Sequence, residues 1–232
     1  PKWHNIKAGT PTMGGFVFLI ATMITAIWVG AWQHQLTTSL FILLFITLLY
    51  GALGFIDDFI KIFKKRNMGL NSLQKLIGQI AGGIVFYLVF LSEGNANTLN
   101  LFGMAIPLNI FYGLFVIFWL VGFSNAVNLT DGIDGLVAGL GTISFATYGI
   151  IAWRQGQIDV LIVCLAVIGG LIGFFPYNRK PAKIFMGDVG SLASGGLLAA
   201  LSILLHQEWP LLRVGLIYVH ETSCVTLQVA SF

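Results

Sequence analysis

The chain has 232 residues, of which 57% are hydrophobic and 9% are charged. Soluble domains carry about 25% charged residues, so this composition excludes an ordinary soluble domain and places the chain among membrane proteins. The formal net charge of +3 is too small to favour a nucleic acid as the partner.

Apolar stretches long enough to cross a bilayer recur along the whole sequence. A spanning helix needs about 20 apolar residues, and backbone polar groups in hydrocarbon must pair within a helix or a closed barrel. The stretches are continuous and do not alternate, so the sequence predicts helices. We expect an all-α polytopic membrane bundle of about eight spanning helices, over residues 14–32, 37–56, 72–92, 106–123, 135–153, 158–175, 191–206 and 211–229. Short loops without a linker or an internal repeat predict a single domain over residues 1–232.

Basic residues gather at one end of this predicted bundle. Of the twelve lysines and arginines, Arg154 and Arg213 alone fall at the other end. Because cytoplasmic loops of membrane proteins carry an excess of lysine and arginine, the basic end is predicted to face the cytoplasm. The same end holds five aspartates, namely Asp57, Asp58, Asp131, Asp134 and Asp188. The charge rule does not require these acids, so they predict a functional site at the cytoplasmic boundary of the membrane.

The first acidic motif is the pair Asp57 and Asp58 at the end of the second predicted span. Carboxylates suit Mg²⁺, which binds one or two of them together with substrate phosphates. One of the two could instead act as a general base. The alternative without a function is a pair at a helix end whose charge is balanced by Lys61, Lys64 and Lys65.

A polar stretch over residues 125–135 follows the fourth predicted span. Its Asn128, Asp131 and Asp134 are of residue types that cap helices and form turns. Asp131 and Asp134 stand three residues apart, so a helical turn would place both on one face. An ordinary capped loop explains one of these acids, but two asparagines together with two aspartates favour a binding site.

Residues 178–191 form a third motif, ahead of the seventh predicted span. Ser191 is expected to cap that helix, and the amides of a helix start beside two glycines form an anion site. Asp188 would tolerate a phosphate there beside a metal ion, because a bound cation reverses the local repulsion. Phe185 is predicted either to stack on a planar base or to anchor the loop at the membrane interface.

Two further segments carry weaker signals. Residues 7–15 open the first predicted span with the ammonium group of Lys7 and with hydroxyls that include Thr12, but ordinary helix-start chemistry explains them as well. His220 and Glu221 are polar residues within an apolar run. Ionisable groups in a membrane segment are functional candidates, although these two could equally pair with each other or with the backbone.

Four of these motifs together resemble the polyprenyl-phosphate N-acetylhexosamine-1-phosphate transferase superfamily. The motifs are residues 10–15 (TPTMGG), 54–58 (GFIDD), 125–135 (NAVNLTDGIDG) and 181–191 (PAKIFMGDVGS). They follow the order and spacing of that superfamily over nearly the whole chain. The first motif and residues 128–132 are similar to those of its phospho-N-acetylmuramoyl-pentapeptide transferase branch.

The resemblance implies a ten-helix enzyme of the bacterial inner (plasma) membrane with its active site on the cytoplasmic face. It implies that this chain lacks one helix at each end and a His-rich cytoplasmic motif, so we expect a fragment truncated at both ends. The implied reaction moves phospho-N-acetylmuramoyl-pentapeptide from UDP-N-acetylmuramoyl-pentapeptide to undecaprenyl phosphate. It yields UMP and the first lipid-linked peptidoglycan precursor. The implied cofactor is Mg²⁺, and the resemblance leaves a homodimer open.

The resemblance also implies roles for matching positions. Asp188 is the expected Mg²⁺ ligand, and Asp57 is the expected base that deprotonates the lipid phosphate, with Asp58 supporting either role. A two-step route with Asp188 as covalent nucleophile is the open alternative. The expected substrate-binding residues are Lys7, Thr12, Asn128, Asp131, Asp134, Asn178 and Phe185, and Phe185 would stack on uracil.

Two other functions compete with this one. A sister transferase that uses UDP-N-acetylglucosamine shares the last motif. An ion-coupled transporter would hold its polar site near the bilayer midplane, often between inverted repeats. Here the acids gather at one boundary and no repeat is apparent, so the sequence favours transfer chemistry at the membrane surface.

Overall fold

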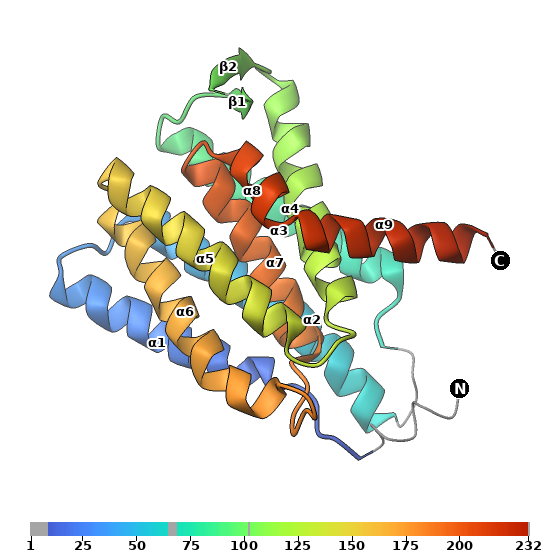
Figure 1. Ribbon diagram of the computed structural model, residues 1–232. Helices are drawn as coiled ribbons and strands as arrows, with labels where there is room; N and C mark the ends of the chain where they lie inside the picture. The colour runs from blue at the N-terminus through green and yellow to red at the C-terminus, as the bar shows by residue number, and fades with distance from the viewer. Residues whose placement is uncertain (1–8, 65–68, 102, 232) are drawn as a thin grey trace.

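The computed structural model describes residues 9–64, 69–101 and 103–231. Within these residues the chain forms a bundle of α-helices with a small β-hairpin (Figure 1). The elements are α1 (Gly15–Trp32), α2 (Thr38–Phe63), α3 (Ser72–Ser92), β1 (Thr98–Leu101), β2 (Met104–Pro107), α4 (Phe111–Thr130), α5 (Leu136–Gln155), α6 (Ile158–Asn178), α7 (Gly187–Leu204), α8 (Glu208–Val214) and α9 (Leu216–Ala230). Among the described residues, the seven helices α1 to α7 are long and apolar enough to cross a membrane, which confirms the predicted all-α polytopic class.

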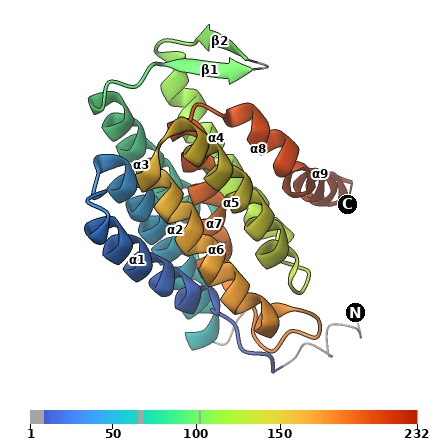
Figure 2. The same cartoon turned by 60° about the vertical axis from the view of Figure 1, so that its left-hand side comes forward.

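The eighth predicted span, over residues 211–229, is not one helix. The structure divides it at Gly215 into the end of α8 and the whole of α9. α9 has 15 residues, fewer than the roughly 20 that a spanning helix needs. It projects sideways from the bundle in Figure 1 and is seen nearly end-on in Figure 2. The prediction failed because glycine is a weak helix former and because His220 and Glu221 interrupt the apolar run.

Two predicted spans end seven residues later in the structure than their apolar pattern indicated. α2 continues beyond residue 56 to Phe63, and α4 continues beyond residue 123 to Thr130. Asp57 and Asp58 therefore stand inside α2, and Asn128 stands inside α4 rather than in a loop. Because each extension contains polar residues, a hydrophobicity pattern does not identify it as helix, although the helical hydrogen bonds continue.

The hairpin of β1 and β2 was not predicted. The strands are antiparallel, with Thr98 opposite Pro107 and Leu101 opposite Met104. Residues 106 and 107 were expected to begin the fourth span, but α4 begins at Phe111, and a proline favours extended backbone in the residue before it. Figure 2 shows the hairpin at the opposite end of the bundle from the start of α1.

The most deeply buried spanning helix is α7, of whose 18 residues 89% are buried. Small residues in membrane helices allow neighbouring backbones to approach closely. A Cβ on Gly54 of α2 would stand 2.1 Å from the carbonyl oxygen of Asp188, and a Cβ on Gly195 would stand 2.4 Å from that of Phe123 in α4. These two glycines let α2 and α4 lie directly against α7. The first of these contacts brings the acidic end of α2 beside Asp188.

Candidate active site

Three carboxylates meet at the end of the bundle opposite the hairpin. We call this end the site end and the other the hairpin end. Asp57 and Asp58 come from α2, and Asp188 lies in the first turn of α7. One oxygen of each lies within 4.8 Å of an oxygen of the other two, and we call the three residues the acid cluster. Asp57 is 0% exposed and Asp58 is 4% exposed. Like charges this close and this buried repel strongly, so the acid cluster requires cations beside it.

Two lysine ammonium groups lie between these carboxylates. Nζ of Lys61 stands 2.5 Å from Oδ2 of Asp57 and 3.1 Å from Oδ2 of Asp188. Nζ of Lys75, from the first turn of α3, stands 3.1 Å from the same oxygen of Asp57 and 2.8 Å from the same oxygen of Asp188. Three negative and two positive charges leave one net negative charge when all five groups are ionised. The cluster can therefore accept a further cation.

Main-chain amides hold the two aspartates of α2. The N–H of Leu70 donates to Oδ1 of Asp57 over 2.7 Å, and the N–H of Val189 donates to Oδ2 of Asp58 over 3.3 Å. Oδ1 of Asp58 lies 3.7 Å from Nζ of Lys61, beyond hydrogen-bond distance. Asp58 is therefore the carboxylate of the acid cluster that its neighbours in the described chain hold most weakly.

Asn128 connects α4 to the acid cluster. Its Nδ2 donates to Oδ1 of Asp188 and to Oγ of Ser191, both over 2.9 Å. Oγ of Ser191 in turn donates to the carbonyl oxygen of Gly187 over 2.9 Å. Ser191 thus lies inside α7, and its prediction as the N-cap is wrong. The helix begins four residues earlier, because Gly187 with a φ of +76° makes the sharp turn into it.

Two side chains predicted to bind substrate tie together the loop after α4 and the loop before α7. Asn178 is buried, and its Oδ1 accepts from the N–H of Gly135 over 3.1 Å while its Nδ2 donates to the carbonyl oxygen of Ile184 over 3.0 Å. Oδ2 of Asp134 accepts from the N–H of Ala182 over 3.1 Å. Both side chains therefore fix the conformation of these two loops beside the acid cluster. We call the two loops the rim of the site.

The other predicted substrate-binding residues lie around the same rim. Asp131 directly follows α4, and its carboxylate is not one of the three within 4.8 Å. Phe185 is half-buried in the loop before α7. Oγ1 of Thr12 lies 3.0 Å from the point where a Cβ on Gly187 would stand, so Thr12 borders the acid cluster. Lys7 falls outside the described residues.

The sequence pattern did not identify Lys61 and Lys75 as site residues. Lys61 was assigned to charge balance at a helix end, and Lys75 counted toward the orientation of the bundle. A signal for Lys61 was available, because it stands four residues after Asp57 and therefore on the same helical face. No local signal was available for Lys75, which reaches the site through the packing of α3 against its neighbours.

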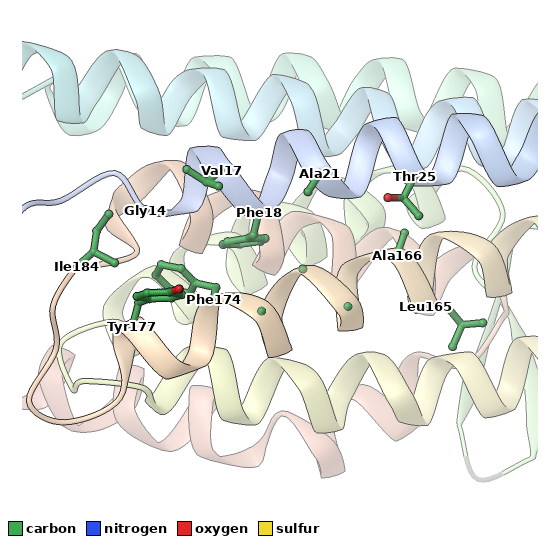
Figure 3. Close-up of a pocket in the computed structure, with 13 residues that line it drawn as sticks. Gly14, Val17, Phe18, Ala21, Thr25, Leu165, Ala166, Phe174, Tyr177 and Ile184 are labelled. Atoms are coloured by element: carbon green, nitrogen blue, oxygen red, sulfur yellow. The ribbon is translucent and has the colours of Figure 1, made fainter.

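An apolar groove of about 510 Å³ runs between α1 and α6. Figure 3 shows Gly14, Phe174 and Tyr177 at its site end and Thr25 and Leu165 farther along. None of its thirteen lining residues, all in the described part of the chain, carries a charge at neutral pH. The groove therefore offers apolar contact and is separate from the acid cluster.

Another buried carboxylate lies at the hairpin end. Glu208, the first residue of α8, is 1% exposed. Its Oε1 accepts from the hydroxyl of Tyr112 over 2.8 Å, and its Oε2 accepts from the N–H of Asn100 over 3.4 Å. The ion pairs of the described residues all lie at the site end, so neutral donors surround Glu208. Burial raises the pKa of Glu208 above its usual value.

Comparison with known families adds a second line of argument. Residues 40–206 match the model of glycosyl transferase family 4, and residues 7–19 match signature 1 of phospho-N-acetylmuramoyl-pentapeptide-transferase. The chain is 76% identical to the phospho-N-acetylmuramoyl-pentapeptide-transferase of Enterococcus hirae and 74% identical to that of Enterococcus faecalis. The protein of the same name from Latilactobacillus sakei is 65% identical. Each match covers the whole of this chain and 73% of the relative.

The helical membrane bundle and the match over residues 40–206 define a membrane transferase of glycosyl transferase family 4. The acid cluster falls inside that matched region. Within this class, the chain belongs to the phospho-N-acetylmuramoyl-pentapeptide-transferase family.

Proposed function

We propose that the protein transfers phospho-N-acetylmuramoyl-pentapeptide from UDP-N-acetylmuramoyl-pentapeptide to undecaprenyl phosphate and releases UMP. The observation that carries the proposal is the convergence of three carboxylates and two lysines at one end of a membrane bundle, in a chain of this family. An oxygen of the lipid phosphate attacks the phosphorus that bears the sugar. The bond from that phosphorus to the UMP oxygen breaks, and a new diphosphate forms on the lipid.

The site end is proposed to face the cytoplasm across the bacterial inner membrane. Ten of the twelve basic residues belong to that end by sequence, as expected for cytoplasmic loops. One substrate is a soluble nucleotide, and the other is a lipid whose phosphate lies in the headgroup plane. A site at the membrane boundary is accessible to both.

The donor set of the acid cluster fits Mg²⁺. Three carboxylate oxygens within 4.8 Å of one another are hard ligands, and Mg²⁺ binds one or two carboxylates together with phosphate oxygens. Asp188 would hold the ion, with Asp58 in support because its Oδ1 is weakly engaged. A bound Mg²⁺ would neutralise charge on the phosphates, whose mutual repulsion opposes the reaction.

The charged residues of the chain then have distinct roles. Asp57 is proposed to accept the proton of the lipid phosphate. Nζ of Lys61 and Nζ of Lys75 stand 2.5 and 3.1 Å from its Oδ2, and the N–H of Leu70 holds its Oδ1. The two lysines also place positive charge where the phosphates meet, so positioning and electrostatics supply most of the catalysis.

The nucleotide-binding part of the site is assigned to the rim. Asp131, Asp134 and Asn178 are proposed to bind or shape the site for the sugar nucleotide, with Phe185 stacking on uracil. Asn128 is proposed to act through Asp188, to which it donates a hydrogen bond. Thr12, which borders the acid cluster, and Lys7 complete the proposed substrate contacts.

A two-step route is the mechanistic alternative. In it the Asp188 carboxylate attacks the sugar-bearing phosphorus, UMP leaves, and the lipid phosphate then displaces Asp188. The two routes differ in the absence of lipid acceptor, where the two-step route alone releases one equivalent of UMP. A rapid-quench measurement without undecaprenyl phosphate separates them.

The proposed function is tested by UMP release from the purified protein, expressed at its full natural length. Each of UDP-N-acetylmuramoyl-pentapeptide and UDP-N-acetylglucosamine is assayed with undecaprenyl phosphate, with and without Mg²⁺. We expect release with the muramoyl substrate in the presence of Mg²⁺. Faster release with UDP-N-acetylglucosamine would assign the protein to the sister activity, and no release with either substrate would refute transfer.

A further inference from the structure

A buried hydrogen-bond network lies one helical turn inside the bundle from the acid cluster. Gln79 of α3 is 1% exposed, and its Nε2 donates to Oγ of Ser124 in α4 over 3.1 Å. Oε1 of Gln79 accepts from Nδ2 of Asn125 over 3.0 Å. Oγ of Ser124 donates to the carbonyl oxygen of Leu192 in α7 over 3.2 Å, and the hydroxyl of Tyr50 in α2 donates to the carbonyl oxygen of Gln79 over 2.8 Å. The network therefore joins α2, α3, α4 and α7.

Three members of this network stand directly beneath groups of the site. Each pair is four residues apart on one helix and therefore on one helical face. The pairs are Gln79 beneath Lys75, Ser124 beneath Asn128, and Leu192 beneath Asp188. The side chains that meet at the acid cluster thus share their helical faces with the residues that are hydrogen-bonded below it.

Near the acid cluster, few other side chains restrain the rotation of α3, since its buried Phe86 and Phe90 lie farther toward the hairpin end. Its apolar window is 28% buried, the smallest share among the seven spanning helices of the described chain. It packs through Gly78, Gly82 and Gly83, where a Cβ would meet side chains of α2 and α4. Glycines allow close approach but present no side chain that interlocks with the neighbour. In this part of α3, the hydrogen bonds that orient the helix come from Gln79.

Both the nitrogen and the oxygen of the Gln79 side-chain amide form hydrogen bonds, and these bonds restrict the rotation of α3 about its axis. A buried amide without partners is strongly unfavourable in apolar surroundings, and hydrogen bonds weaken steeply when their angles are wrong. A rotation of α3 would break the bonds to Ser124 and Asn125 together. The same rotation would move Lys75, because it shares a helical face with Gln79.

We propose that Gln79 is a positioning residue that holds the ammonium group of Lys75 between Asp57 and Asp188. Its kinetic consequence rests on the proposed transfer function, since Lys75 acts there beside the reacting phosphates. The position of Lys75 does not depend on the transfer function and can be measured without following turnover.

The test compares Gln79→Leu with the conservative Gln79→Glu in the full-length protein. Leucine matches glutamine in size but makes no hydrogen bond, whereas a protonated glutamate in this buried site retains one donor and one acceptor. We expect Gln79→Leu to lower kcat about tenfold and to leave KM for the nucleotide within about twofold, because an interaction made in the transition state is lost. We expect Gln79→Glu to restore most of kcat.

A second readout follows Lys75 directly. Acetylation of lysines by an amine-reactive reagent, mapped by mass spectrometry, should be faster at Lys75 in Gln79→Leu than in the wild type. The matched control is Ser202→Ala, which removes the hydrogen bond of 2.9 Å from Nε1 of Trp119 to Ser202 between α4 and α7, away from the site. The control should leave both kcat and Lys75 acetylation at wild-type values.

The outcomes separate the two proposals. Wild-type acetylation of Lys75 in Gln79→Leu would overturn the positioning role, and so would an equal loss of kcat in Ser202→Ala. If Gln79→Leu does not fold, the acetylation rate of Lys75 in Asn125→Ala decides, because that variant removes the donor to Oε1 of Gln79, and a wild-type rate there overturns the proposal. Faster acetylation of Lys75 in a protein without UMP release would support the positioning role and refute the transfer function alone.

Discussion

Buried carboxylates lie at both ends of the bundle, but their surroundings differ. At the site end, Asp57, Asp58 and Asp188 share two ammonium groups within 4 Å. At the hairpin end, Glu208 has a tyrosine hydroxyl and a main-chain N–H as its partners. Glu208 links α8 to α4 and to β1, so its environment suits a structural connection.

The difference favours the site end as the place where the reaction occurs. A single buried acid with neutral donors satisfies its hydrogen bonds with little charge, whereas five charged groups gathered at one point carry a large desolvation cost. Packing alone gives no reason to gather them. A concentrated set of charges is instead suited to binding phosphates and a divalent ion, and the predictions that follow test this contrast from the largest expected effect to the smallest.

The largest effect is expected for Asp188→Asn. The substitution keeps the size of the side chain and removes the carboxylate that both lysines share and that is proposed to hold Mg²⁺. We expect UMP release to fall by about 1,000-fold or more, equivalent to about 4 kcal/mol in the activation barrier. The melting temperature of the purified protein should change little, because one of three mutually repelling carboxylates is removed. Retained Mg²⁺-dependent turnover would exclude Asp188 from the metal role.

A smaller loss is expected for Lys75→Met. Methionine keeps the unbranched shape of the lysine stem, but Asp57 and Asp188 lose one of their two shared cations. We expect kcat to fall about 10- to 100-fold, or about 1.4 to 2.8 kcal/mol. Lys64→Met is the matched control, since Lys64 is exposed at the end of α2 and forms none of the ion pairs of the described residues. Equal losses in the two variants would mean that general positive charge, rather than the position of Lys75, matters.

Much of the fold was predictable because bilayer thickness fixes the length of a spanning helix. Seven of the eight predicted spans correspond to helices of the structure. The break at Gly215 and the β-hairpin were missed, because an apolar run has the same composition whether it crosses a membrane, bends or pairs as a strand. The ends of α2 and α4 were missed because polar residues that face a site look like a loop in a hydrophobicity pattern.

The acids of the site were predictable as a group, and their partners were not. Asp57, Asp58 and Asp188 stood out because acids are costly near hydrocarbon. The contribution of Lys75 depends on α3 packing against α2 and α4, which no local pattern encodes. Gln79 has no charge and sits in an apolar stretch, so its hydrogen bonds became visible in the structure alone. The roles of these residues in catalysis stay predictions.

At the hairpin end, a stability effect without a catalytic one is expected for Tyr112→Phe. The change removes the hydroxyl that donates to Glu208 and leaves the ring in place. We expect a loss of about 1–3 kcal/mol in the free energy of unfolding, typical of a buried acceptor that loses its partner. Thermal unfolding in detergent measures the loss, and the kcat of UMP release should stay within about twofold of the wild type. A loss of kcat as large as that of Lys75→Met would show that the two ends are coupled.

The smallest expected effect is on the pH dependence of stability, and it tests the contribution of Glu208 alone. Burial raises the pKa of Glu208 above the ordinary glutamate value of 4.5, so the folded protein binds this proton more tightly than the unfolded chain does. The stabilising contribution of the protonated group is therefore complete below pH 4.5 and is lost as the pH rises toward the folded-state pKa. Glu208→Gln cannot titrate, and the other ionisable groups, His206 included, are common to both proteins. The melting temperature of the wild type minus that of Glu208→Gln should accordingly decrease as the pH is raised from 4.5 to neutrality. A difference that increases over this range would mean that Glu208 is held as a charged group, and the contrast between the two ends of the bundle would then fail.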